Sequence, residues 1–176
     1  MAIGSLCKRR KHRNVLIERT NKMDKKICPI TGLTGETKCQ TCKDKLCEQG
    51  LFACLIAGSR TFNNSKLLEE TMDRLLKNKD KVLIISGGAR GADTLAENYA
   101  KKKGYKTLIM PAEWDKYGKS AGYKRNAKMH EALACFEDRG CVLFWDGKSK
   151  GTQHNIPLAN EHNTPIRIVR FDQLTK

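Results

Sequence analysis

The chain has 176 residues, of which 39% are hydrophobic and 6% aromatic, so it suffices for about one domain with one core and is too short for a large multidomain enzyme. The 34 Lys and Arg against 19 Asp and Glu give a net charge of +15, which favours an anionic partner such as nucleic acid, a nucleotide or an acidic surface. The same charge also fits a highly charged soluble surface without such a partner.

No apolar run approaches the roughly 18 residues that a membrane helix needs, and the leading MAIGSLCKRRKHRN lacks the apolar core of a signal peptide. We therefore expect a soluble protein with no membrane partner in a reducing, cytoplasmic compartment, despite its eight Cys.

The composition and apolar periodicity of the sequence change near Gly50. Residues 1–50 carry 12 basic and 5 acidic side chains and show almost no apolar periodicity. Residues 51–176 alternate short apolar runs with amphipathic stretches, the pattern of parallel strands joined by helices. The expected division is a basic, Cys-rich extension over residues 1–50 and a second domain over residues 51–176.

The second domain contains five apolar runs that predict strands, with helices between them. In chain order the strands are FACLIA after Leu51, VLIIS from Val82, TLIM before Pro111, CVLFW from Cys141 and IRIV from Ile166. The helices are one capped by Ser65 with Leu68, Met72, Leu75 and Leu76 on one face, one from Ala92 ending at Gly104, one over Tyr123 to Phe136 and one over Thr152 to Asn163. Because parallel crossovers are right-handed and bury both sheet faces, this order predicts an α/β, Rossmann-like three-layer sandwich with a parallel sheet of about five strands.

The loops after the strands carry the candidate ligand-binding residues. In such a sheet, ligands bind beyond the carboxyl ends of the strands, where glycines let backbone N–H groups approach a phosphate and helix N-termini favour negative charge. The candidates are Gly58, Ser59, Arg60, Gly87, Gly88, Arg90, Gly91, Asp93, Glu113, Trp114, Gly147, Lys150, Gly151 and Thr152, together with Arg125 and Asn126 in the third helix. Three such loops at one sheet edge favour an anion site over tight turns alone. Their spacing is neither GxGxxG with an acidic ribose ligand nor GxxxxGKS, which disfavours ordinary dinucleotide dehydrogenases and P-loop NTPases.

Several of these residues have a structural interpretation as well. Asp93 either caps the second helix or binds a ligand, and Arg125 is either a phosphate contact or a solvated helix residue. Trp114 and Tyr117 either stack on a base or pack a loop onto the core. His130 fits a partly buried histidine better than a catalytic one.

Four motifs, in order, resemble the YspA-type members of the SLOG superfamily. They are GSRTF, SGGARGADTLAENYA, AEWDKYGKSAGYKRNAKMHE and FWDGKSKGTQHNI, and the resemblance covers roughly residues 51–170. It implies the Rossmann-like fold. The superfamily includes three classes of protein: sensors of nucleotide-derived signals such as ADP-ribose derivatives, the Lonely Guy phosphoribohydrolases, and the DNA-processing protein DprA. The resemblance therefore leaves these functions open.

The resemblance also implies roles for individual residues. KRNAKMHE resembles the RKxxM stretch of the phosphoribohydrolases, which places Arg125 where their phosphate- or ribose-contacting Arg lies. GKSKGTQHN resembles their GGxGTxxE loop, with Gln153, His154 and Asn155 where acidic residues assist glycosidic cleavage. His154, or Glu113 or Asp93 from a neighbouring loop, would then have to serve as the acid or base.

We therefore expect a protein that binds a nucleotide or ADP-ribose-like ligand at the carboxyl edge of the sheet, as a sensor or sequestering protein whose turnover of the ligand is slow or absent. The alternatives are a nucleotide N-glycosidic hydrolase and a DprA-like single-stranded DNA-binding protein, in which Arg90 would contact a nucleic-acid phosphate. The sequence leaves open whether the chain forms a homo-oligomer.

The N-terminal extension contains a candidate zinc site. Cys28, Cys39, Cys42 and Cys47 include a CxxC pair, and zinc prefers tetrahedral thiolate ligation. A region with so little apolar content could fold around a structural zinc ion, while the alternative is a leader with free thiols. The preceding KRRKHRN is either a nucleic-acid contact or a solvated arm.

Overall fold

The structure is a computed structural model, and it describes residues 51–172. The predicted Cys-rich extension and its four candidate zinc ligands lie outside the described residues.

The sheet is fully parallel and has five strands. They are β1 (Leu51–Gly58), β2 (Lys81–Ser86), β3 (Lys106–Ile109), β4 (Arg139–Trp145) and β5 (Ile166–Arg170). Their spatial order is β3-β2-β1-β4-β5, and every neighbouring pair is parallel. The Rossmann-like fold is thus confirmed. The strand order reverses between β1 and β4, so the carboxyl ends of these two strands define the point where such sheets bind ligands.

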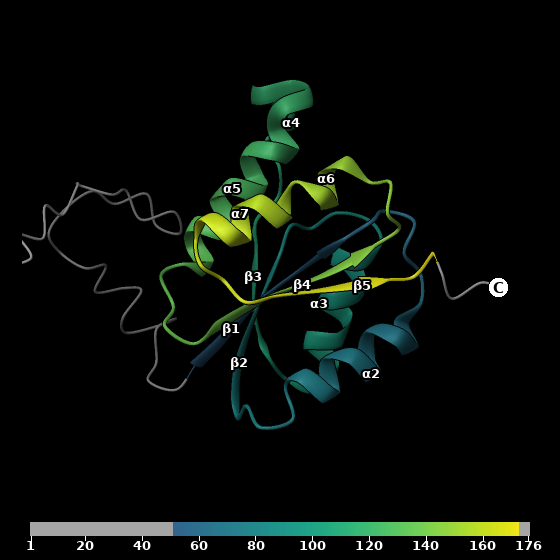
Figure 1. Cartoon of the computed structure of the whole chain (residues 1–176), viewed down its shortest axis with the longest axis vertical. Helices are drawn as coiled ribbons and strands as arrows, with labels where there is room; N and C mark the ends of the chain where they lie inside the picture. Colours follow the sequence, from purple (N-terminus) through teal and green to yellow (C-terminus); the bar gives the residue numbers. More distant parts are fainter. Residues whose placement is uncertain (1–50, 173–176) are drawn as a thin grey trace, which may run out of the picture.

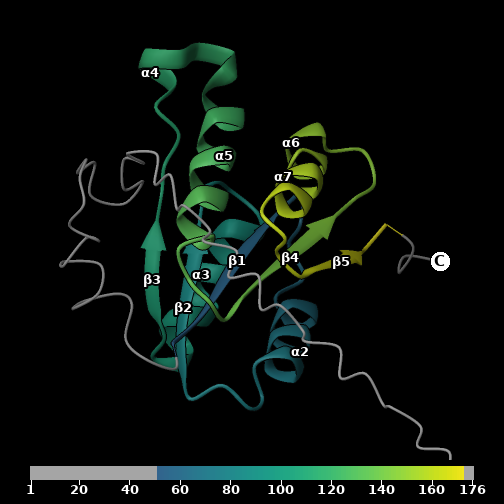
Figure 2. The ribbon, with the colours of Figure 1, turned by 60° about the vertical axis from the view of Figure 1, so that its left-hand side comes forward.

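Helices cover both faces of the sheet, as Figures 1 and 2 show. They are α2 (Ser65–Leu75), α3 (Ala92–Lys103), α4 (Trp114–Tyr117), α5 (Ala121–Leu133), α6 (Lys150–Gln153) and α7 (Asn155–Glu161), with a short 3-10 turn η1 (Gly118–Ser120) between α4 and α5. Helices α2 and α3 lie on one face, and α5 and α7 on the other. The short α4 stands beyond the carboxyl end of β3 (Figure 2).

The core consists of two layers, one on each side of the sheet. Along β1, Cys54 and Ile56 face α2 and α3, whereas Leu55 and Ala57 face α5. All four are buried, which is expected of a central parallel strand covered on both faces. Full burial of one large aliphatic side chain stabilises the fold by about 1.5–3 kcal/mol, so this strand anchors both layers.

Two details of the first predicted helix are wrong. Its N-cap is Asn64 rather than Ser65, because the Asn64 side-chain oxygen accepts a hydrogen bond from the backbone N–H of Leu67 at 2.9 Å. Asn and Ser cap helices about equally well, so propensity does not distinguish them. Leu75 is 43% exposed and lies off the buried face that Leu68 and Met72 define.

The later helices also differ from the prediction. The loop after β3 contains α4 and η1, and α5 covers Ala121–Leu133 instead of Tyr123 to Phe136. The predicted last helix is divided at His154 into α6 and α7. Pro157 explains this division, because it lacks an N–H and is tolerated only in the first turn of a helix.

Candidate functional site

A cleft of about 440 Å³ opens at the carboxyl ends of β1 and β4. This volume lies within the roughly 300–1,000 Å³ of ordinary small-molecule sites. The predicted residues that line it are Gly58, Arg60, Asp93, Trp114, Arg125, Asn126, Gly151 and Thr152. The structure therefore brings together residues from the end of β1 and the loop after it, and from α3, α4, α5 and α6.

The other predicted ligand residues lie outside the lining of the cleft. They are Ser59, Gly87, Gly88, Arg90, Gly91, Glu113, Gly147 and Lys150. Among them, Arg90 is exposed, while Ser59 and Gly87 are buried. All of these loops nevertheless follow parallel strands, so they lie at the same end of the sheet.

A short polar network joins the loops after β1 and β4. The Ser59 hydroxyl accepts a hydrogen bond from the backbone N–H of Asp146 at 3.1 Å. The Asp146 carboxylate in turn accepts the backbone N–H groups of Lys148 and Ser149 at 2.9 and 2.7 Å. Burial by itself would raise the pKa of Asp146, but these hydrogen bonds outweigh it and hold the pKa below its usual value. Asp146 is therefore an ionised loop anchor.

Two glycines allow the loops to approach one another. Gly91 has φ +91°, and a Cβ there would lie 2.8 Å from backbone atoms of Arg60. A Cβ on Gly58 would lie 2.6 Å from that of Ala92. Both positions thus require glycine for packing between strand-end loops, independently of any ligand.

Arg125 and Asp93 form a buried ion pair in the wall of the cleft. Their Nη1 and Oδ2 atoms are 3.4 Å apart, and the side chains are 13% and 4% exposed. Burial raises the pKa of Asp93 above its usual value, although Arg125 opposes the shift. Within residues 51–172, the Arg125 Nε is buried and has no hydrogen-bond partner. A buried unpaired donor is costly, so an anion that accepted from this guanidinium would be bound favourably.

Two asparagines hold the short helix α6 in place. The side chains of Asn126 and Asn155 each donate to the Gly151 carbonyl at 3.0 Å. The Asn155 side-chain oxygen lies 3.2 Å from His130 Nε2. The Asn155 Nδ2 donates to backbone carbonyls, so its oxygen is the acceptor and His130 Nε2 is the donor of this hydrogen bond. Asn126 and Asn155 thereby fix the position of α6 relative to α5.

Two aromatic side chains are half-exposed in the cleft. Trp114 is 48% and Tyr123 is 43% exposed. The guanidinium carbon of Arg60 lies 5.8 Å from the Trp114 ring centre. Tyr123 was not among the predicted site residues, although its place one turn before Asn126 on the same helix was a usable signal. Exposed ring faces of this kind can stack on a nucleobase.

The two predicted catalytic residues do not meet in the cleft. Glu113 accepts a hydrogen bond from Lys128 at 2.9 Å, which is the main reason that its pKa lies below the usual value. The His154 ring packs edge-on against Tyr123 with ring centres 4.8 Å apart, and burial lowers its pKa. Neither residue lines the cleft. The carboxylates that line it are Asp93 and Asp146.

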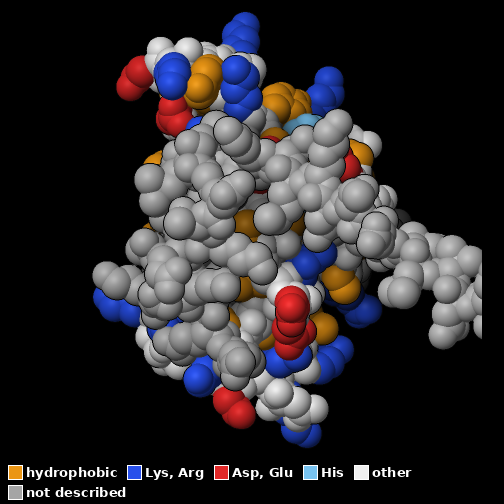
Figure 3. Space-filling model, turned by 90° about the vertical axis from the view of Figure 1, so that its left-hand side faces the viewer, with side chains coloured by type: hydrophobic (Ala, Val, Ile, Leu, Met, Phe, Trp, Pro, Cys, Tyr) orange, Lys and Arg blue, Asp and Glu red, His pale blue; other side chains and the backbone are white. Residues whose placement is uncertain are grey.

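Lys and Arg side chains gather with acidic and hydrophobic side chains at the upper end of the molecule, where α4 lies (Figure 3). Over residues 51–172, no cluster of three or more His, Cys, Asp or Glu side chains could hold a metal ion. In the same part of the chain, no helix has the length and apolar character required to cross a membrane.

The fold and the cleft together define a Rossmann-like α/β protein with a pocket at its topological switch point. The sequence model of the YspA, cpYpsA-related SLOG family matches residues 53–117. The gene 61 protein of Mycobacterium phage D29 is 31% identical over 118 residues, which are 64% of this chain and 91% of the phage protein. The chain belongs to the YspA, cpYpsA-related SLOG family.

Among solved structures, the chain is similar to DNA processing protein A from Helicobacter pylori, a structure described for its single-stranded DNA binding mode. The TM-score is 0.49 and the sequence identity 21%, over 68% of this chain. The match spans 65% of that protein, just under two thirds of its length.

Proposed function

We propose that the chain binds a nucleotide-derived ligand in this cleft, with a phosphate beside Arg125 and the base against Trp114 and Tyr123. The observation that carries the proposal is the arrangement in one cleft of a buried guanidinium with an unpaired donor and two half-exposed aromatic rings. Guanidinium groups match phosphate geometry, and aromatic faces match bases.

The protein binds this ligand without cleaving it. A general acid or base must lie within hydrogen-bond reach of the reacting group. Glu113 and His154 lie outside the cleft lining, Asp146 is held by backbone N–H groups, and Asp93 is paired with Arg125. Binding without turnover suits a sensor or a sequestering protein.

Titration calorimetry with AMP and ADP-ribose tests the proposal. Arg125→Ala removes the charge-assisted hydrogen bonds and should weaken binding by about 1.5–3 kcal/mol, which is roughly 10- to 150-fold. Arg74→Ala is the matched control, because Arg74 is an exposed arginine in the last turn of α2. The proposal would be contradicted if neither nucleotide bound the unmodified chain, or if Arg125→Ala bound them with the same affinity as the unmodified chain.

Chromatography of the same mixtures tests the absence of turnover, since no free base should accumulate. Release of base that disappears in His154→Ala or Glu113→Gln, with ligand affinity intact, would instead identify a nucleotide N-glycosidic hydrolase.

The net charge of +15 favours a second candidate, a single-stranded nucleic acid. Arg60 and Lys119 line the cleft as exposed cations and would meet successive phosphates. A steep loss of affinity for single-stranded DNA with salt, together with competition by AMP, would favour this candidate.

A further inference from the structure

A second pocket of about 210 Å³ lies next to the cleft, towards the end of β3. Its lining residues are Met110, Pro111, Glu113, Tyr117, Ala121, Lys124, Arg125 and Lys128. Arg125 is the one residue that lines both cavities. Arg125 thus lies between two cavities at the same edge of the sheet.

The second pocket is positively charged. Lys124, Arg125 and Lys128 all come from α5 at spacings that place them on adjoining faces of the helix. Glu113 is the carboxylate in the lining, and it is bound to Lys128. Lys124 lies 3.9 Å from the Tyr117 ring centre and has no carboxylate partner in the described part of the chain. Lys124 therefore remains available to an incoming anion.

The size of the pocket limits what it can hold. At about 210 Å³ it is smaller than the roughly 300–1,000 Å³ of sites for whole small molecules. A compact anionic group such as a phosphate suits both its volume and its charge. The planar guanidinium of Arg125 has five N–H donors. Its Nη1 donates to Asp93, so other donors remain for an anion in the cleft and for one in the second pocket.

We propose that this pocket is a second anion subsite, which takes a second phosphate of the nucleotide whose first phosphate lies in the cleft. The inference rests on the proposed function and narrows its ligand class to nucleotides with two phosphate groups. The two groups come either from a pyrophosphate, as in ADP, or from a 5′-phosphorylated dinucleotide such as pApA.

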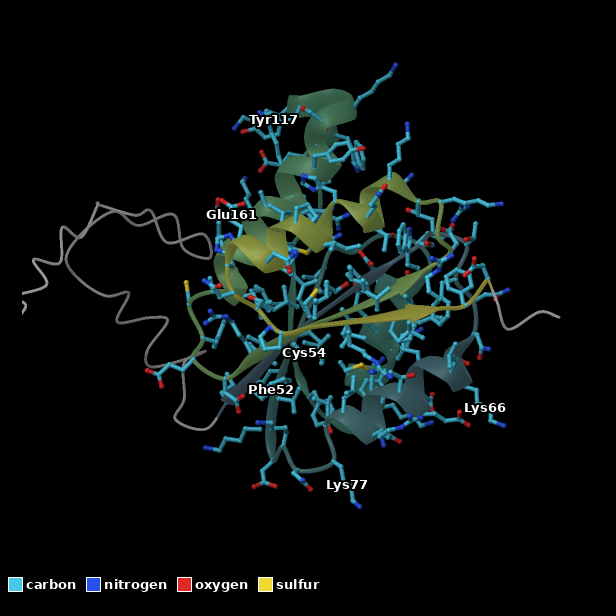
Figure 4. The ribbon with its side chains drawn as sticks, in the orientation of Figure 1. Phe52, Cys54, Lys66, Lys77, Tyr117 and Glu161 are labelled. Atoms are coloured by element: carbon cyan, nitrogen blue, oxygen red, sulfur yellow. The ribbon has the colours of Figure 1, made fainter. Side chains whose placement is uncertain are left out.

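Lys124→Glu tests the subsite, with Lys77→Glu as its matched control. Both lysines are exposed, so both variants should retain the fold, and each changes the net charge by the same amount. Tyr117, which marks the second pocket, lies at the upper end of the molecule in Figure 4, and Lys77 lies at the lower end. Any difference between the variants therefore reports the local charge rather than the total charge.

Calorimetric titration of the full chain with AMP, ADP and pApA at one ionic strength provides the measurement. Lys124→Glu should weaken a two-phosphate ligand at least tenfold and leave AMP within about twofold, while Lys77→Glu leaves all three unchanged. A loss confined to ADP assigns the subsite to a pyrophosphate, and one confined to pApA assigns it to a phosphodiester.

An equal loss for AMP and for both two-phosphate ligands, or no loss for any of them, would overturn the subsite and leave the proposed function standing. If the unmodified chain bound none of the three, the proposed function itself would fail, and the subsite would fail with it.

Discussion

Gly87 offers a way to move Arg125 without changing a charge. The residue follows β2, and its backbone does not adopt a positive φ, so alanine suits the main chain. A Cβ at this position would overlap the Arg125 guanidinium and lie 2.8 Å from Asp93 Oδ2. Because the guanidinium ends a flexible side chain, the arginine yields rather than the backbone.

The size of the effect follows from hydrogen-bond geometry. A contact stretched by about 1 Å from its usual length is no longer a hydrogen bond, so displacement of the guanidinium by one methyl group should remove its bond to a phosphate. Gly87→Ala should then cost about 1.5–3 kcal/mol of AMP binding, as Arg125→Ala does.

A double-mutant cycle distinguishes this mechanism from general damage. In the Arg125→Ala background, the methyl group at position 87 has no guanidinium to displace, so the double variant should bind AMP about as weakly as Arg125→Ala alone. Calorimetry on the four proteins gives the coupling energy. Additive losses, or an unaffected Gly87→Ala, would refute the steric connection between Gly87 and Arg125.

Three further predictions concern pH, base recognition and metal. Burial keeps the pKa of His130 at about 4, below the roughly 6.5 of an unfolded chain, so its contribution to stability is complete above pH 6.5 and declines by up to about 3 kcal/mol as the pH falls towards 4. Urea unfolding at several pH values should show a shallower decline in His130→Phe than in the unmodified chain, and parallel curves would contradict this. Trp114→Ala should cost about 1–3 kcal/mol of AMP binding but leave competition by inorganic phosphate unchanged, and an equal loss for both would argue against base stacking. Elemental analysis of the full chain should find about one zinc ion, lost in Cys39→Ser, and a metal-free protein with freely titratable N-terminal thiols would refute the zinc site.

The strands and their arrangement were predictable because each depends on a local pattern and a general topological rule. Apolar runs such as VLIIS have the length of a buried strand and are bounded by turn residues. Once the strands are parallel, their following loops must share one edge, and that placed Gly58, Asp93 and Gly151 in the same region without knowledge of any contact.

The rest of the site depends on contacts between distant side chains, which periodicity does not reveal. Gly87 resembles a phosphate-binding glycine in the sequence, yet it is buried against Arg125, 38 residues further along the chain. The second pocket likewise depends on how α4 stands over α5, and α4 has only four residues and no apolar repeat. The sequence alone makes Glu113 a candidate acid, because its ion pair with Lys128 of α5 is visible only in the structure.

Asn155 has a consequence for the energetics of binding. Its amide group joins the Gly151 carbonyl of α6 to His130 of α5, and Asn126 of α5 donates to the same carbonyl. The helix that carries Arg125 is therefore joined to α6 by hydrogen bonds within the protein itself. A ligand that binds between α5 and α6 contacts two helices whose separation these hydrogen bonds already fix. The conformational entropy lost in ordering α6 is therefore a cost of folding and not of ligand binding.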